Sequence, residues 1–312
     1  MRNAFANEIT EIAKSNPDVV LLSGDIGNRM FDKFKIVAKE RFFNCGIAEA
    51  NMMSTAAGLA STGLRPFVYT ITPFTTTRCL EQIKIGLGYH NYPVVIVGTG
   101  SGLSYAELGP THHSLEDIAI IRSIPGISIY TPSDPNEVKT HIHEALKGSK
   151  PSYIRLGKKG EKDLSPRRIR KNGLSSILNE GRRLLVISYG PIVSSVLDSI
   201  DELEEYREHI EFIDIGRLNP LPNDLLEECS IKFSKWLIIE EHYEKGGLGS
   251  MLLEWQATTK KNDNNLTLFL KGVPHEFIHK LGDQNYVRSS MKLDKQGIIE
   301  KIKSILENDN RI

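Results

Sequence analysis

The sequence predicts an α/β protein in which a doubly wound, mostly parallel sheet is followed by a second, smaller α/β domain. Short apolar runs alternate with helix-like segments along the first half of the chain, as in a parallel sheet covered by helices. A charged run, Lys158 to Lys171, interrupts this alternation, which starts again at Arg183. The length of 312 residues also exceeds one typical domain. We therefore expect a first domain over residues 1–160, a linker over 161–180 and a second domain over 181–312.

The first domain is expected to open with an amphipathic helix and to build its sheet from six apolar segments. Two connections have helical composition, Phe74–Gly88 and Asp134–Lys147, and the capping sequence SDPNE introduces the second. A small-residue helix follows the second strand. The predicted strands are Asp18–Gly27, Phe42–Ile47, Arg65–Thr72, Pro93–Thr99, Ile127–Pro132 and Ser152–Leu156.

The second domain repeats the pattern with four apolar segments. Helices are expected up to Tyr206, after Pro222, from the GGLGS sequence onward and from Asp294 to near the end. The predicted strands are LLVISYG (184–190), IEFIDIG (210–216), KWLIIEEH (235–242) and LTLFLKGV (266–273).

Composition excludes several classes of partner. Lys plus Arg equals Asp plus Glu at 39 each, so no net charge attracts nucleic acid or an anionic membrane. The three cysteines have no paired metal-ligand spacing, which favours reduced thiols. The chain has no run near the ~18 apolar residues of a membrane span and no signal-peptide pattern. We expect a cytoplasmic protein that binds neither nucleic acid nor membrane.

Glu49 stands at the turn between the Phe42–Ile47 strand and the small-residue helix. Ligands bind at such turns in open α/β sheets. A carboxylate here also complements the helix dipole, and that simpler interpretation stays open. A burial argument favours a functional role, because burial disfavours the charged form of a carboxyl group and lets it share a proton with a ligand nitrogen. Close packing against the helix is predicted from Ala48, Ala50, Ser54, Ala56, Ala57, Gly58 and Ala60.

The loop GSGLSYAELGPTHHSLED, which follows the Pro93–Thr99 strand, is the second candidate site. Its histidines titrate near neutral pH and can serve as proton or hydrogen-bond donors. Adjacent histidines point apart and no third ligand has a suitable spacing, so a metal site is not expected. His112 is the candidate donor, and Glu107, which precedes it in the loop, is a further candidate for substrate binding.

Two glycine-containing motifs are weaker. Gly24-Asp25-Ile26-Gly27 departs from the Gly-Asp-Gly diphosphate motif of thiamine enzymes, yet Asp25 ends the first strand and is a candidate to line a cofactor cleft. The GGLGS sequence lacks the lysine of a P-loop, and a tight packing turn is favoured over a phosphate cradle. The nearby Glu240, Glu241 and His242 are interpreted as a polar strand end or an interface.

Together these features resemble the C-terminal half of transketolase, that is, its pyrimidine-binding domain and C-terminal domain. The resemblance runs from about Asn3 to Ile305. The segment GIAEANM around Glu49 fits the family's catalytic glutamate motif, and the GPTH sequence ending at His112 fits its active-site loop. The segment YTITPFTTTRCLEQI also fits.

The resemblance implies thiamine diphosphate as the cofactor and a role for each matching residue. Glu49 would hydrogen-bond N1′ of the aminopyrimidine and promote its imino tautomer, and Phe74, unless it is a core residue, would stack on that ring. His112 would bind the ketose donor. Arg78 and Lys158 would grip a sugar phosphate, although relatives usually have Arg where Lys158 stands.

Two departures and one absence qualify the resemblance. Relatives have a carboxylate where this chain has Leu108, and a histidine where it has Gly100, which suggests a non-standard sugar. The diphosphate-binding half is not in this sequence, so the chain resembles the C-terminal-half subunit of a split, α₂β₂ transketolase whose N-terminal-half partner holds Mg²⁺ or Ca²⁺. The alternatives are the beta subunit of a 2-oxo acid dehydrogenase and a non-catalytic regulatory subunit.

Overall fold

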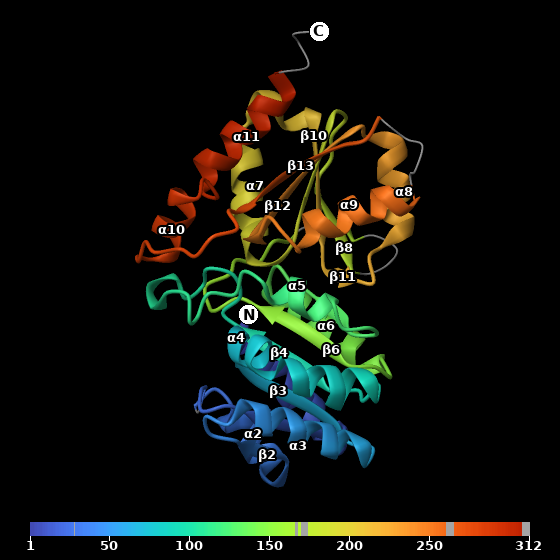
Figure 1. Ribbon diagram of the computed structural model, residues 1–312, viewed down its shortest axis with the longest axis vertical. Helices are drawn as coiled ribbons and strands as arrows, with labels where there is room; N and C mark the ends of the chain where they lie inside the picture. The colour runs from blue at the N-terminus through green and yellow to red at the C-terminus, as the bar shows by residue number, and fades with distance from the viewer. Residues whose placement is uncertain (28, 166–167, 170–173, 260–264, 308–312) are drawn as a thin grey trace.

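The computed structural model describes residues 1–27, 29–165, 168–169, 174–259 and 265–307, and it contains two α/β domains stacked along the long axis of the molecule (Figure 1). The predicted fold class is confirmed. Residues 166–167 and 170–173 of the predicted linker, with residues 260–264 and 308–312 of the predicted second domain, lie outside the described residues. Within the described ranges, no helix is long and apolar enough to cross a membrane.

The first sheet has seven strands in the order β11-β5-β6-β4-β3-β1-β2. All neighbouring strands are parallel except β11, which comes from the second half of the chain and pairs antiparallel with β5. The strands are β1 (Val19–Ser23), β2 (Phe42–Asn44), β3 (Arg65–Ile71), β4 (Val95–Thr99), β5 (Ser128–Tyr130), β6 (Ser152–Leu156) and β11 (Arg217–Asn219).

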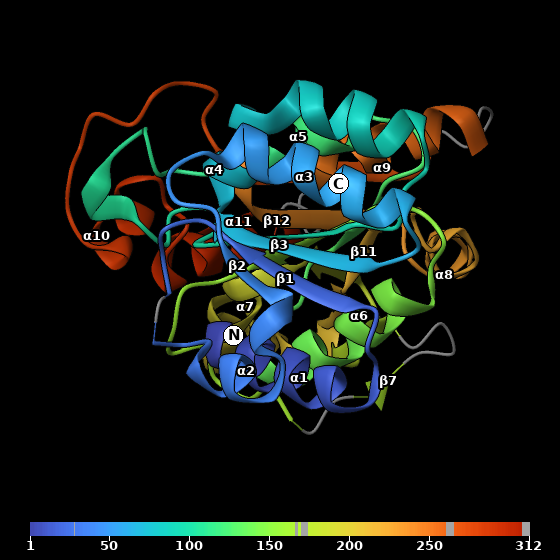
Figure 2. The same cartoon turned by 90° about the horizontal axis from the view of Figure 1, so that it is seen from below.

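Helices cover both faces of this sheet, with α1, α2 and α6 on one side and α3, α4 and α5 on the other (Figure 2). Alternate residues of β1 serve the two faces: Val19 and Leu21 pack with α1, whereas Val20 and Leu22 pack with α3. The helices are α1 (Arg2–Ser15), α2 (Asp32–Val37), α3 (Glu49–Ser61), α4 (Thr72–Thr75), α5 (Asp117–Arg122) and α6 (Pro135–Lys147).

Two predicted elements differ in the structure. The Phe42–Ile47 strand was expected to be buried, but β2 is shorter and forms the sheet edge, where Phe43 is 45% exposed. The predicted Phe74–Gly88 helix is broken into α4, a 3-10 turn and a π-helical segment, Gln82–Tyr89. The hydroxyls of Thr75 and Thr76 both donate to the carbonyl of Thr72, and such back-bonding competes with a regular helix.

The second sheet has six strands in the order β13-β12-β9-β10-β8-β7, with β8 and β7 antiparallel to their neighbours. Both β7 and β8 begin within the 161–180 segment that was expected to be a linker. The strands are β7 (Arg168–Ile169), β8 (Ser175–Asn179), β9 (Leu184–Ser188), β10 (Ile210–Ile215), β12 (Lys235–Tyr243) and β13 (Thr267–Val273). The helices are α7 (Val193–Glu202), α8 (Asn223–Lys232), α9 (Leu248–Thr259), α10 (Gln284–Ser290) and α11 (Lys295–Glu307).

The two domains share a continuous apolar core. Ile118 and Ile121 of α5 belong to the same buried cluster as Trp236 and Trp255 of the second domain. Each such side chain contributes about 1.5–3 kcal/mol when fully buried, so the seam between the domains is held firmly. The loop that contains His112 leaves the first sheet at this seam and returns to it at α5.

Candidate active site

Glu49 is placed by a short, tightly bonded turn between β2 and α3. The amide of Cys45 donates to the carbonyl of Ser23, and Gly46 adopts a positive φ of 66° and accepts from the amide of Asp25 at 2.9 Å. This conformation favours glycine. Glu49 then begins α3 with only 6% exposure, so its carboxylate lies near the positive end of the helix dipole in a largely dry place.

Asp25 lies beside this turn but outside the remainder of the site. Its side chain is exposed, and Oδ1 accepts from Nδ2 of Asn44 at 3.2 Å. This bond joins the second residue after the end of β1 to the last residue of β2.

Arg78 connects Glu49 to Phe74. Its Nη1 lies 3.1 Å from Oε2 of Glu49, and its Cζ lies 4.1 Å from the centre of the Phe74 ring. Arg78 therefore makes an ion pair and a cation–π contact at once. Phe74, in α4, is half-buried at this junction, so its ring borders the site.

His112 continues the chain of contacts from Phe74. The two ring centres are 5.3 Å apart in an edge-to-face arrangement, and Nδ1 of His112 is 2.9 Å from Oγ1 of Thr111. Burial lowers the pKa of His112 below its ordinary value of 6.5, and the nearby His113 and Arg78 lower it further. The ring is therefore neutral at pH 7 and can donate through one nitrogen and accept through the other.

Lys158 and Glu107 form the far end of the site. They are joined by a 2.9 Å ion pair, which lowers the pKa of Glu107. The Lys158 ammonium also lies 4.4 Å from the ring centre of Tyr105, which in turn lies 6.1 Å from the His112 ring. Both charged residues border a cleft of about 880 Å³ between the domains, which Arg288 of α10 also lines.

Tyr105 is the site residue that the sequence reasoning missed. An aromatic residue inside a Gly- and Ser-rich loop was the available signal. Its ring occupies the space beside Gly100, where a Cβ would overlap it. The glycine at this position, one of the two departures from the transketolase pattern, thus makes room for Tyr105.

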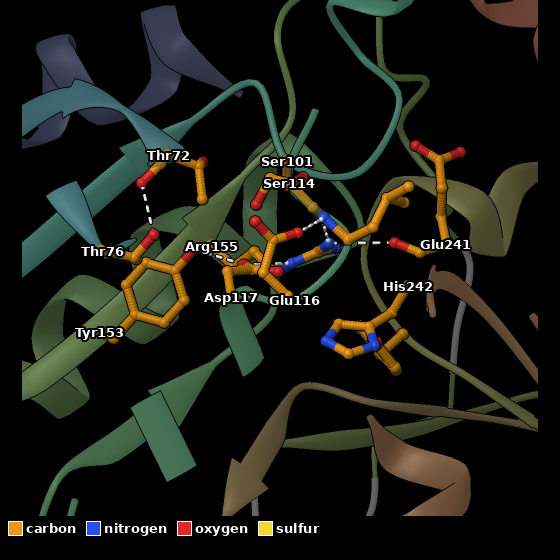
Figure 3. Close-up of polar contacts among 12 residues, drawn as sticks. Thr72, Thr76, Ser101, Ser114, Glu116, Asp117, Tyr153, Arg155, Glu241 and His242 are labelled. Atoms are coloured by element: carbon orange, nitrogen blue, oxygen red, sulfur yellow. Dashed lines mark hydrogen bonds and ion pairs between the residues drawn. The ribbon is translucent and has the colours of Figure 1, made fainter. Parts of the chain in front are cut away.

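A buried polar network supports the His112 loop (residues 101–114) from below (Figure 3). Asp117 accepts from Nε of Arg155 at 2.7 Å and from the hydroxyl of Tyr153 at 2.6 Å. Burial acts to raise the pKa of Asp117, but the Arg155 guanidinium outweighs it and holds that pKa below its ordinary value. Arg155 also donates to the carbonyls of Ser114 and Glu241 at 3.0 Å, so the network joins both domains.

The site has the groups that would hold the aminopyrimidine half of thiamine diphosphate. A shielded carboxylate, Glu49, lies beside an aromatic ring, Phe74, and both are already in contact with the planar, nitrogen-bearing group of Arg78. Glu49 and Phe74 together therefore fit a flat heterocycle with a hydrogen-bonding nitrogen. In the described part of the chain, no group of three or more His, Cys, Asp or Glu residues is arranged to hold a metal ion.

Comparison with known proteins identifies the domains. Residues 1–160 match the family model of the transketolase pyrimidine binding domain, and residues 173–275 match that of the transketolase C-terminal domain. An apulose-4-phosphate transketolase subunit of Phocaeicola vulgatus is 29% identical over 95% of this chain and 94% of its own length. 1-Deoxy-D-xylulose-5-phosphate synthase of Syntrophus aciditrophicus is 30% identical over 97% of this chain but only 46% of the synthase.

A solved structure described as a split gene transketolase, inactive beta4 tetramer, has a TM-score of 0.84 at 26% identity, covering 97% of this chain and 96% of that one. The two family models match the chain in the same order as the two sheets occur along it. Fold and site together define a two-domain protein that begins with a pyrimidine-binding domain. The chain belongs to the transketolase family, whose members are transferases that use thiamine diphosphate. Its extent corresponds to that of the C-terminal-half subunit of a split transketolase.

Proposed function

We propose that this chain, with a partner equivalent to the N-terminal half of transketolase, transfers a two-carbon ketol unit from a ketose to an aldehyde acceptor. The observation that carries this proposal is the unbroken series of contacts from Glu49 through Arg78 and Phe74 to His112, which come from three separate segments. Thiamine diphosphate, when bound, supplies the carbon nucleophile that takes up and releases the ketol unit.

Glu49 is proposed to hold a proton at N1′ of the cofactor's aminopyrimidine. Its position at the start of α3, 6% exposed, limits competition from water for this hydrogen bond. Phe74 is proposed to pack against the same ring. Asp25 borders the turn that carries Glu49 and is proposed to line the cofactor cleft.

His112 is proposed to position a hydroxyl of the ketose, because its neutral ring offers both a donor and an acceptor. Lys158 and Arg78 supply cations for a substrate phosphate. Lys158 is a point charge without the planar fork of arginine, so it attracts phosphate with less geometric demand. Glu107 keeps Lys158 beside Tyr105 and the His112 loop.

The substrate is proposed to be a deoxy, branched or otherwise modified sugar. Leu108 lies at the tip of the His112 loop with 49% exposure, so packing does not require an apolar residue there. A leucine cannot hydrogen-bond a sugar hydroxyl, and a hydroxyl left unpaired on burial costs about 1–3 kcal/mol. The likeness to a protein named for apulose 4-phosphate supports this proposal.

The assembly is proposed to be an α₂β₂ heterotetramer in the cytoplasm, with Mg²⁺ or Ca²⁺ bound by the partner chain. Thiamine diphosphate carries its negative charge on the diphosphate, which needs a divalent cation with oxygen ligands. The likeness to a split gene transketolase supports a separate partner.

A donor comparison tests the reaction type. The chain mixed with its partner is assayed with a ketose donor and an aldehyde acceptor, and separately with a 2-oxo acid and a lipoyl or aldehyde acceptor, with the Glu49→Gln variant as the control. We expect ketose-dependent transfer that this variant lacks. Turnover of the 2-oxo acid alone would favour a dehydrogenase beta chain or a synthase. Equal activity of the wild-type and Glu49→Gln mixtures would indicate that this chain is a non-catalytic regulatory subunit.

A further inference from the structure

The His112 loop is closed at its base by the chain itself. Gly102 and Ser114 form an isolated antiparallel pair, with N–H to carbonyl distances of 3.1 and 3.0 Å. His112, which is proposed to contact substrate, and Glu107, which pairs with Lys158, lie between these two residues in the sequence. A contact that holds Gly102 and Leu103 in place therefore also sets the direction in which the loop leaves the sheet.

Glu241 of the second domain contacts the base of this loop directly. The residue is 4% exposed at the end of β12, and its Oε1 accepts from the amide of Leu103 at 2.6 Å. Gly102 has a φ of 60° and lies so close to Glu241 that a Cβ would overlap the carboxylate. The loop backbone thus packs onto this buried carboxylate with no side chain between them.

Two residues of α10 fix the carboxylate itself. Nε2 of Gln284 donates to Oε1 at 3.1 Å, and Nε of Arg288 donates to Oε2. Arg288 is 9% exposed, so the charges are paired in a place largely shielded from water. The same helix packs against the 106–108 turn of the loop, and Leu281 lies opposite Gly109 near the tip.

We infer that Glu241 is a positioning residue that holds the His112 loop in its working place, so the second domain controls the geometry of a site whose proposed substrate-binding side chains come from the first domain. The inference rests on the proposed function for what the loop does. The hydrogen bonds from a backbone amide and an arginine hold the buried carboxylate, and with it the loop, in one position. Without this carboxylate the loop can shift.

The chemistry of an amide makes the test sharp. In Glu241→Gln, the remaining side-chain oxygen can still accept from the Leu103 amide, but the new NH₂ group then faces the N–H of Arg288. If the amide group is flipped, the NH₂ group faces the N–H of Leu103 instead. In both orientations two hydrogen-bond donors face each other. The double variant Glu241→Gln/Arg288→Met removes that conflict and keeps the acceptor for Leu103.

Glu240→Gln is the matched control. Glu240 is an adjacent buried carboxylate in the same strand, but its partners are the Tyr189 hydroxyl and the amides of Leu248 and Gly249. These groups lie outside the His112 loop. The variant therefore reports what the loss of a buried carboxylate does to the second domain in general.

Two readouts avoid any dependence on activity: amide hydrogen exchange over residues 101–114, and the NMR signals of the His112 ring. We expect exchange in Glu241→Gln to be roughly tenfold or more faster, the equivalent of losing one charge-assisted hydrogen bond. The His112 signals should shift, the double variant should restore both readouts, and Glu240→Gln should leave both unchanged.

Kinetics of the assembled enzyme adds the consequence, since a loop misplaced by about 1 Å can lower kcat/KM by about 10²-fold. The inference would be overturned if Glu241→Gln showed the same hydrogen exchange and His112 signals as the wild type. It would also be overturned if Glu240→Gln changed both readouts as much as Glu241→Gln does. Failure of the ketose assay in wild type would count against the proposed function only, because hydrogen exchange still decides whether Glu241 positions the loop.

Discussion

The guanidinium of Arg78 lies 3.1 Å from the carboxylate of Glu49 and 4.1 Å from the centre of a phenylalanine ring, that of Phe74. A flat nitrogen-bearing group thus forms an ion pair with the glutamate and lies over the aromatic ring at the same time. These are the two contacts proposed for the aminopyrimidine of thiamine diphosphate. Arg78, whose side chain is 50% exposed, is free to swing outward, whereas the Glu49 side chain is 7% exposed and is not.

Replacement of Glu49 by glutamine should nearly abolish activity while leaving the fold intact. Glutamine has the same shape but cannot hold or release a proton at N1′, and loss of a positioned proton-transfer group costs about 10²- to 10⁴-fold. Steady-state kinetics of the assembled enzyme measures the loss, and circular dichroism checks the fold. Activity within a few-fold of wild type would remove Glu49 from the catalytic role.

Replacement of Arg78 by methionine should tighten cofactor binding slightly. The variant removes a competitor for Glu49 and Phe74, and a half-exposed ion pair contributes about 0.2–1 kcal/mol, or roughly 1.5- to 5-fold in Kd. Calorimetry of the assembled enzyme measures Kd. Arg122→Met, which removes a cation paired with Glu254 instead, is the control and should leave Kd unchanged. Weaker binding in Arg78→Met would show that the arginine supports the cofactor and does not compete with it.

Replacement of Leu108 by aspartate should improve turnover of ordinary sugar phosphates. The new carboxylate restores an acceptor for a sugar hydroxyl, worth about 1–3 kcal/mol, or roughly 5- to 150-fold in kcat/KM for xylulose 5-phosphate. Leu108→Ala removes the side chain without adding an acceptor and should give no such gain. If the wild-type enzyme already uses xylulose 5-phosphate and ribose 5-phosphate with ordinary transketolase efficiency, the modified-sugar proposal is wrong.

The pH dependence of activity should follow the neutral form of His112. Because burial, His113 and Arg78 lower its pKa below 6.5, the ring stays neutral to more acidic pH than an exposed histidine does. The acid limb of kcat/KM should therefore have its midpoint below pH 6.5. NMR titration of the ring, assigned with His112→Gln, checks the pKa directly. Arg78→Met removes a positive neighbour and should move the midpoint upward, and a wild-type midpoint at or above 6.5 contradicts the prediction.

Local patterns in the sequence predicted much of the fold. Asp134 accepts from the amides of Asn136 and Glu137 and caps α6, which ends at Lys147 as expected. Glu49 begins α3 at the turn after β2 and is buried, also as expected. Such features depend on periodicity and on residues a few positions apart, so one stretch of sequence contains the whole signal.

Long-range contacts could not be predicted in this way. Leu103 and Glu241 are 138 residues apart, and nothing in either neighbourhood indicates the other. The glycine at position 100 was recognised as a departure from the family pattern, but its reason, the ring of Tyr105, depends on how the loop folds back. The exposed edge position of β2 likewise depends on strand order and not on the apolar composition of the strand.

Cofactor binding should require both this chain and its partner. The surface along α3, the helix that begins at Glu49, is suited to close approach by a second chain: a groove of about 470 Å³ runs between α3 and the 81–92 segment, and its lining includes the small residues Ala57, Gly58 and Gly86. A neighbouring backbone can pack closely there. The diphosphate needs a cation with oxygen ligands, and we propose that the partner provides them.

Calorimetry with magnesium and thiamine diphosphate, first on this chain and then on its mixture with the partner, separates the two requirements. The chain alone offers Glu49 and Phe74 to the pyrimidine, so we expect weak or undetectable binding that is independent of magnesium. The mixture should bind tightly and only with magnesium or calcium. Substitution of Gly58 by leucine fills the groove and should weaken cofactor binding by the mixture, whereas Ile231→Leu, at an exposed position on α8, should not. Tight, magnesium-dependent binding by the isolated chain would refute the split-enzyme proposal, because the diphosphate site would then have to lie within this chain.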